Sequence, residues 1–195
     1  MNTTFQQLFL SLIFYVYART LVAGTSITTH PDTGLKGWKF NQDDIELELI
    51  QRLPDQTRGF FIARGFSTKI ADDIANACIF QTIIRNTGSI KNGSPVNVAL
   101  KNWRIQMNNQ KRPIKLKEDW EKVWSTSNVS TAAQLAFRWA TFPGEQTFHP
   151  SGDYNWGMIS FGVKPGSVFD LYIEWKTDTQ THNALITNIQ CANDR

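Results

Sequence analysis

Apolar and polar residues alternate over several segments of this chain, which is the period of a β-strand with one buried face. The clearest case is residues 169–176 (FDLYIEWK), and residues 158–163 form another apolar segment just before it. Residues 164–167 (KPGS) contain a Pro and a Gly between the two segments, and this composition favours a tight turn. The pattern therefore predicts a β-hairpin.

The last strongly apolar segment covers residues 185–191. A period of two places Leu185, Ile189 and Cys191 on one face of this predicted strand. We therefore expect the final cysteine of the chain to point into the core.

Three earlier segments predict further strands. Residues 45–49 (IELEL) alternate strictly, so their isoleucine and leucines are expected to be buried. Residues 78–86 are followed by Asn- and Gly-containing turn signals. The alternation in residues 96–107 changes phase at residues 101–102, which predicts a bulge there.

Residues 135–142 (LAFRWATF) fit both the period of a strand and that of a helix. We interpret this segment as a strand in which Phe137 and Trp139 face inward. The tryptophan is then expected to contribute to packing.

Three short helices are predicted between the strands. The first begins at Pro54, which suits the first helical turn, and ends near Gly65. The second follows Ser67, a residue type that caps helix N-termini well. The third covers residues 117–124, where two tryptophans share one face.

Together these elements predict a mainly β fold, an antiparallel β-sandwich with two or three short inserted helices. This plan is compatible with immunoglobulin-like and cupredoxin-like sandwiches, and such architectural likeness does not fix function. We expect a single β-rich domain over residues 38–195. Residues 24–37 are poor in large apolar side chains and are predicted to be a linker or an extended arm.

The N-terminus carries an uncharged apolar run of 11 residues at 8–18, which is shorter than the roughly 20 residues that span a bilayer as a helix. The run predicts a signal peptide over residues 1–23, cleaved after Ala18 or Ala23. No Lys or Arg precedes it, so a buried first element or an uncleaved anchor is the alternative. We predict an extracytoplasmic location, periplasmic or secreted, with no stable membrane span after cleavage.

The formal net charge is only +3. Lys and Arg are scattered except in residues 111–117, and acidic residues follow that cluster directly at Glu118, Asp119 and Glu121. Nucleic-acid binding needs a concentrated basic face, so we expect no nucleic-acid partner.

Cys78 and Cys191 are the only cysteines, and both lie in apolar strand contexts. An exported chain folds in an oxidising compartment, where such a pair is typically bonded. We predict a disulfide. Two buried free thiols are the alternative if the N-terminus is not a signal.

Residues 143–157 form the best candidate for a functional surface, because Gly, Pro, carboxylate, His and aromatic residues gather there. We predict ligand binding by Glu145, His149, Asp153 and Trp156. The alternative is an ordered connection whose aromatics pack beneath it. No G-x-S-x-G, HExxH or phosphate-loop motif accompanies these residues.

The alternative chemistry is a copper or zinc site formed by His149, His182 and Met158. A blue-copper arrangement is disfavoured, because only ANDR follows Cys191 and supplies neither His nor Met. Isolated histidines in loops usually face solvent, so we expect no cofactor.

Two hypotheses of function follow. We favour an exported, non-catalytic β-sandwich module that binds a partner protein or a small ligand. The alternative is a metal-handling protein or a hydrolase that uses residues 143–157. No catalytic residue is assigned.

Overall fold

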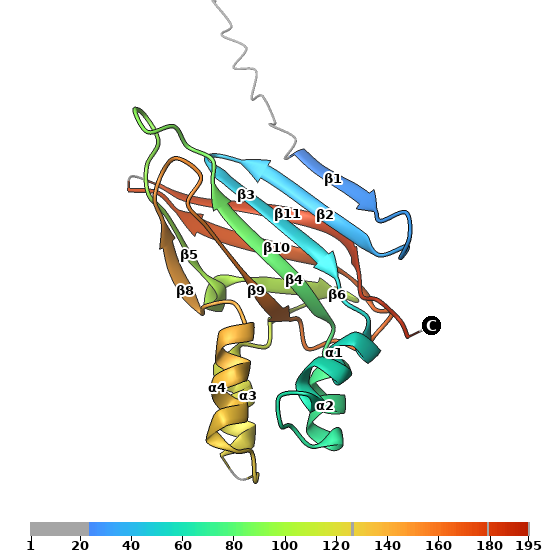
Figure 1. Ribbon diagram of the computed structural model, residues 1–195. Helices are drawn as coiled ribbons and strands as arrows, with labels where there is room; N and C mark the ends of the chain where they lie inside the picture. The colour runs from blue at the N-terminus through green and yellow to red at the C-terminus, as the bar shows by residue number, and fades with distance from the viewer. Residues whose placement is uncertain (1–23, 126, 179, 195) are drawn as a thin grey trace, which may run out of the picture.

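The computed structural model describes residues 24–125, 127–178 and 180–194. They form two packed β-sheets with a layer of helices at one end (Figure 1). The predicted signal peptide over residues 1–23 lies outside the described residues. No helix within the described ranges combines the length and apolarity needed to cross a bilayer.

Within the described residues, the first sheet has five strands in the order β1-β2-β3-β4-β9, and all neighbours are antiparallel. The strands are β1 (Gly24–Thr29), β2 (Lys36–Gln42), β3 (Ile45–Gln51), β4 (Ile79–Asn86) and β9 (Tyr154–Ser160). Thus Gly24–Thr29, within the predicted linker or extended arm, is the edge strand of a sheet.

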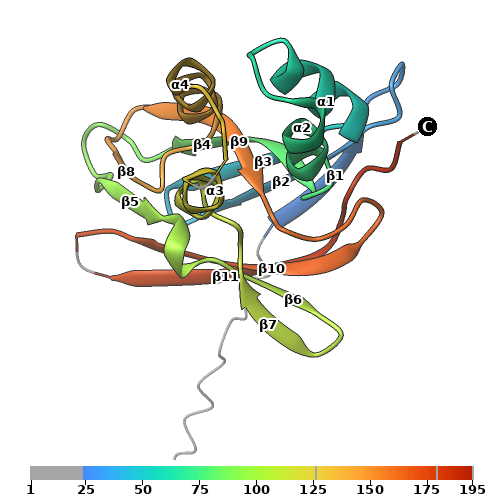
Figure 2. The ribbon, with the colours of Figure 1, turned by 90° about the horizontal axis from the view of Figure 1, so that it is seen from below.

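The second sheet has six strands in the described part of the chain, in the order β7-β6-β10-β5-β8, with β11 on the other edge of β10. The strands are β5 (Val96–Ala99), β6 (Arg104–Met107), β7 (Gln110–Pro113), β8 (Glu145–Phe148), β10 (Val168–Lys176) and β11 (Thr181–Gln190). Figure 2 shows the two sheets as separate layers, which confirms the predicted antiparallel sandwich.

The alternation of apolar residues explains the core between the sheets. Ile45, Leu47 and Leu49 of β3 are all buried, as predicted. The inward residues of β10 face them from the second sheet and are also buried. Each strand thus contributes one apolar face, and burial of that face is the main favourable term for the fold.

The described residues contain four α-helices, which are α1 (Pro54–Ile62), α2 (Thr68–Ala75), α3 (Lys117–Trp124) and α4 (Thr131–Ala140). The first three match the predicted helices, and the Ser67 hydroxyl accepts a hydrogen bond from the Ile70 backbone nitrogen at 3.4 Å, as an N-cap should. Aromatic side chains of the helices form a second apolar cluster against the first sheet.

Helix α4 occupies the segment that was predicted to be a strand, so that prediction was wrong. Ser130 caps the helix by accepting from the Ala133 backbone nitrogen at 3.2 Å. Residues two apart point to nearly opposite sides of a helix. Phe137 is therefore buried as predicted, whereas Trp139 is exposed.

The predicted hairpin over residues 158–176 was also wrong. Its two strands exist, but β9 belongs to the first sheet and β10 to the second. The Pro- and Gly-containing segment between them passes from one sheet to the other. Local turn residues cannot distinguish this connection from a hairpin, because both need a change of direction.

Strand β11 buries Ile186, Ile189 and the following Cys191, while the predicted Leu185 is exposed. A register shift in the pairing with β10 and a positive φ of 57° at Asn188 mark a bulge, which changes the buried phase along the strand. The predicted bulge at residues 101–102 is instead a 3-10 turn over Leu100–Asn102.

Cys78 and Cys191 form the predicted disulfide, which joins two residues that are 113 positions apart in the sequence. It joins the residue before β4 in the first sheet to the residue after β11 in the second. The bond therefore ties the two layers together at the end of the sandwich nearest the helices.

We expect the C78A/C191A variant to lose about 4 to 5 kcal/mol of unfolding free energy, because the bond restricts a long loop in the unfolded chain. Urea unfolding with and without a thiol reductant measures this loss. Reductant should lower the midpoint of the unmodified protein and leave that of the variant unchanged. If complete reduction left the urea midpoint of the unmodified protein unchanged, the expectation would be contradicted.

Candidate functional site

The predicted binding segment, residues 143–157, is divided between the two sheets. Glu145 lies on β8 and forms an ion pair with Lys101 at 3.5 Å. The Asp153 carboxylate accepts a hydrogen bond from the His149 backbone nitrogen at 2.9 Å. This contact closes the turn between β8 and β9, so Asp153 already has a local structural role. Trp156 is exposed on the outer face of the first sheet.

The structure does not bring together His149, His182 and Met158. His182 stacks on Trp175 at 5.3 Å between ring centroids, and its Nδ1 lies 3.3 Å from the Asp43 carboxylate. Met158 is buried in the cluster between the helices and the first sheet. Among the residues with described positions, no group of three His, Cys, Asp or Glu side chains could hold a metal ion.

A different hollow, of about 370 Å³, lies between α1, α4 and the outer face of the first sheet. Its volume falls at the lower end of the range that small-molecule sites occupy. We call it the Trp–Arg groove. It is lined by Arg52, Phe60, Arg64, Gln81, Ala136, Trp139, Ala140, Trp156 and Met158.

Two exposed tryptophans line the Trp–Arg groove. Trp139 of α4 is 78% exposed and Trp156 of β9 is 60% exposed. The other five of the seven tryptophans in the chain are buried, and they are Trp38, Trp103, Trp120, Trp124 and Trp175. Burial of an indole ring is strongly favourable, so two exposed tryptophans beside one hollow make it the candidate site.

Close contact between α4 and β9 places Trp139 near Trp156. The Phe142 backbone nitrogen donates to the Met158 carbonyl at 2.9 Å, and Thr141 forms a parallel bridge with the same residue. A Cβ added to Gly157 would lie 2.6 Å from the Phe142 nitrogen. Glycine at this position therefore allows the end of the helix to lie directly on the strand.

Two arginines supply positive charge to the groove. Arg52 precedes α1 and Arg64 follows it, and their guanidinium carbons lie 5.6 and 3.3 Å from the centroid of the same Phe60 ring. The Nε of Arg52 is buried and has no hydrogen-bond partner among the described residues. Burial lowers the pKa of the Arg52 guanidinium, and the nearby positive charge of Arg64 lowers it further.

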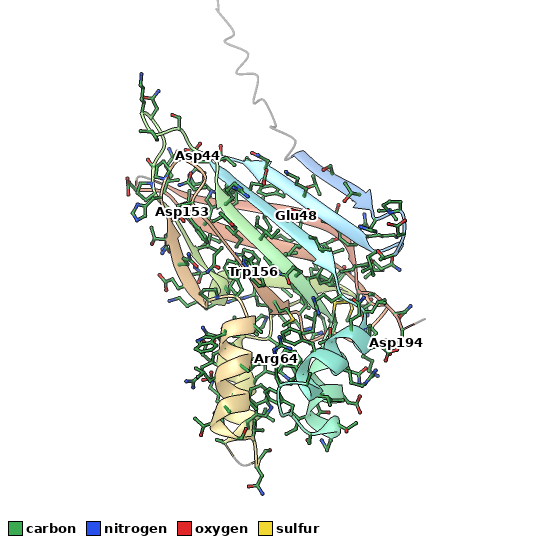
Figure 3. All side chains as sticks on the ribbon, in the orientation of Figure 1. Asp44, Glu48, Arg64, Asp153, Trp156 and Asp194 are labelled. Atoms are coloured by element: carbon green, nitrogen blue, oxygen red, sulfur yellow. A yellow bond between two sulfur atoms is a disulfide. The ribbon has the colours of Figure 1, made fainter. Side chains whose placement is uncertain are left out.

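Figure 3 labels two of the groove residues, Trp156 and Arg64. Trp156 lies on the face of the first sheet, and Arg64 lies below it between α4 and α1. Phe61 of α1 and Phe137 of α4 pack together at 5.4 Å between ring centroids, which fixes the two helices relative to each other. An apolar contact outside the groove lining therefore joins the two helices that flank the groove.

Trp156 is the one residue from the predicted ligand-binding set that lines this groove. Arg52, Arg64 and Trp139 were missed because they come from three separate segments. A sequence signal existed for Trp139. If residues 131–140 are read with the period of a helix, this tryptophan lies on the side opposite the buried Phe137. A large aromatic residue on the solvent side of a helix is a signal of a candidate site.

Comparisons with protein-family models, with curated proteins and with solved structures found no match. The case for a site therefore depends on the geometry of the groove.

We expect Gly157→Ala to destabilise the protein by about 1 to 3 kcal/mol, because the added methyl forces α4 away from β9. Gly59→Ala is the matched control. A Cβ at Gly59 would meet nothing within 4 Å, and removing a helical glycine should stabilise by about 0.5 to 1 kcal/mol. Thermal and urea unfolding of both variants measure these opposite changes in stability. Equal changes in the two variants would argue against the tight α4–β9 contact.

Proposed function

We propose that this chain is an exported, non-catalytic β-sandwich module that binds a small ligand in the Trp–Arg groove. The observation that carries the proposal is the pair of exposed tryptophans, Trp139 and Trp156, beside a hollow of about 370 Å³. A groove of this size can enclose one small molecule between rigid walls. Indole rings give such a molecule a large contact area with little loss of side-chain entropy.

The polar groups of the groove favour binding over catalysis. Arg52, Arg64 and Gln81 contribute guanidinium and amide groups. A guanidinium stays protonated at neutral pH and an amide does not titrate, so neither is suited to transfer protons. These groups can instead donate hydrogen bonds that orient a ligand.

The disulfide and the N-terminal sequence support export. Disulfides persist mainly in oxidising compartments, and the Cys78–Cys191 bond joins the two sheets. The uncharged apolar run at residues 8–18 has the length of a signal-peptide hydrophobic region. Export would also expose the groove to ligands outside the cytoplasm.

We expect a thermal-shift screen of small ring-bearing compounds to find ligands whose affinity falls about tenfold or more in W139A/W156A. Each aromatic contact contributes roughly 0.5 to 1.5 kcal/mol beyond the area that it buries. Titration calorimetry of the hits measures the change.

Leu135→Ala and Val168→Ala are the controls, because these residues are 42% and 49% exposed and lie outside the groove. Both should leave the affinity of every hit unchanged. Hits that bind W139A/W156A as tightly as the unmodified protein would show that the groove is not the site.

We expect the mature chain, produced with its own N-terminus in a secreting host, to begin after residue 18 or 23. Intact-mass spectrometry checks this, and reduction should then add two hydrogens because the two sulfurs are bonded. A chain that retains Met1, is recovered from the cytosol and has two alkylatable thiols would overturn the export proposal.

A further inference from the structure

We propose that the ligand of the Trp–Arg groove carries an anionic oxygen group, a carboxylate or a phosphate, that binds to Arg52 and Arg64 while its ring contacts Trp139 and Trp156. This inference rests on the proposed function and adds the chemical class of the ligand. It follows from the charges, the hydrogen bonds and the shape of the groove.

The two arginines have no acidic partner. Neither Arg52 nor Arg64 forms an ion pair with a carboxylate among the described residues. Both guanidinium groups lie over one phenyl ring, so two like charges are held close together. An anion between them would replace this repulsion with two attractions.

Among the other described arginines, Arg58, Arg85 and Arg138 form ion pairs, whereas Arg104 and Arg112 donate hydrogen bonds to backbone carbonyls. Arg58 contacts Asp55 and Asp72, and Arg138 contacts Glu121. Arg52 and Arg64 differ from these arginines because both lie on the same Phe60 ring at the groove.

Arg52 presents a donor that the fold leaves unsatisfied. Its Nε is buried and has no hydrogen-bond partner in the described structure. A buried donor without an acceptor costs free energy, and an anionic oxygen is the strongest acceptor that could satisfy it.

Phe60 holds the guanidinium groups in place for this role. An arginine stacked on an aromatic ring keeps the edge of its guanidinium free for in-plane hydrogen bonds. The Nη1 of Arg64 donates a hydrogen bond to the Phe60 carbonyl at 3.0 Å. Its remaining donors, together with those of Arg52, match the spaced oxygens of a carboxylate or phosphate.

The remainder of the lining is suited to a ring. Ala136, Ala140 and Met158 contribute small or apolar side chains to the same lining as the two tryptophans. A flat apolar body can contact an indole face, while its acidic substituent reaches the arginines. A neutral ring or a small anion alone would use only part of the groove.

The test compares three probes of the same ring and different charge: 2-naphthoate, 2-naphthyl phosphate and the neutral 2-naphthalenemethanol. Quenching of tryptophan fluorescence and titration calorimetry measure their affinities for the full mature protein. We expect at least one anionic probe to bind about tenfold or more tightly than the alcohol, as charge-assisted hydrogen bonds predict. The preferred anion distinguishes a carboxylate from a phosphate ligand.

Arg64→Gln should reduce the affinity of the anionic probe to that of the alcohol and leave the alcohol unaffected. Arg64 is exposed, so the variant retains the apolar contacts of the fold. Arg52→Lys keeps the positive charge but removes the planar set of guanidinium donors, so it should reduce the affinity for the anionic probe only in part. Arg138→Gln is the matched control, because this arginine is next to Trp139 but pairs with Glu121 outside the groove.

The outcomes separate the two proposals. Equal binding of all three probes, unaffected by Arg64→Gln but lost in W139A/W156A, would overturn the anionic class and leave the groove as the ligand site. An absence of binding by every probe would count against both proposals. Anion preference that depends on Arg138 and not on Arg64 would also overturn the assignment.

Discussion

The contact between the end of α4 and strand β9 is the constraint on which the Trp–Arg groove depends. Phe142 donates to the Met158 carbonyl at 2.9 Å, and Gly157 leaves no room for a side chain between the helix and the strand. Because the contact is made by backbone atoms, it fixes the helix more rigidly than side-chain packing alone. Without it, Trp139 and Trp156 would not share one groove.

Packing beneath the groove depends on the same arrangement. Phe137 of α4 contacts Phe61 of α1 and Trp124 of α3, at 5.4 and 4.6 Å between ring centroids. This aromatic cluster joins helices from distant parts of the sequence into one layer against the first sheet. Residues next to its members, Phe60 beside Phe61 for example, then lie at the groove. Adjacent positions of the chain thus contribute to the aromatic cluster and to the lining of the groove.

The sequence predicted the strands better than their connections. Alternation in residues 45–49 identified the buried face of β3, because burial on one side imposes a period of two. The same rule could not reveal that β9 and β10 lie in different sheets, since sheet membership depends on long-range pairing. In α4, a short apolar segment fitted both periods, and the Ser130 cap together with packing against α1 and α3 favours the helix. The groove was missed for a related reason, as it brings together residues from before α1, after α1, α4 and β9.

Two features of the groove oppose folding, and they occur at the same place. Exposed Trp139 and Trp156 forgo burial, and the adjacent Arg52 and Arg64 repel each other without a carboxylate to offset the repulsion. Selection for stability alone would replace the two tryptophans or the two arginines. Such substitutions would not disturb the core between the sheets, because these side chains are not part of it. Local departures from the most stable arrangement are expected at functional sites, where a ligand supplies the missing contacts. The coincidence of aromatic exposure and unpaired positive charge is therefore the physical basis of the proposed ligand site.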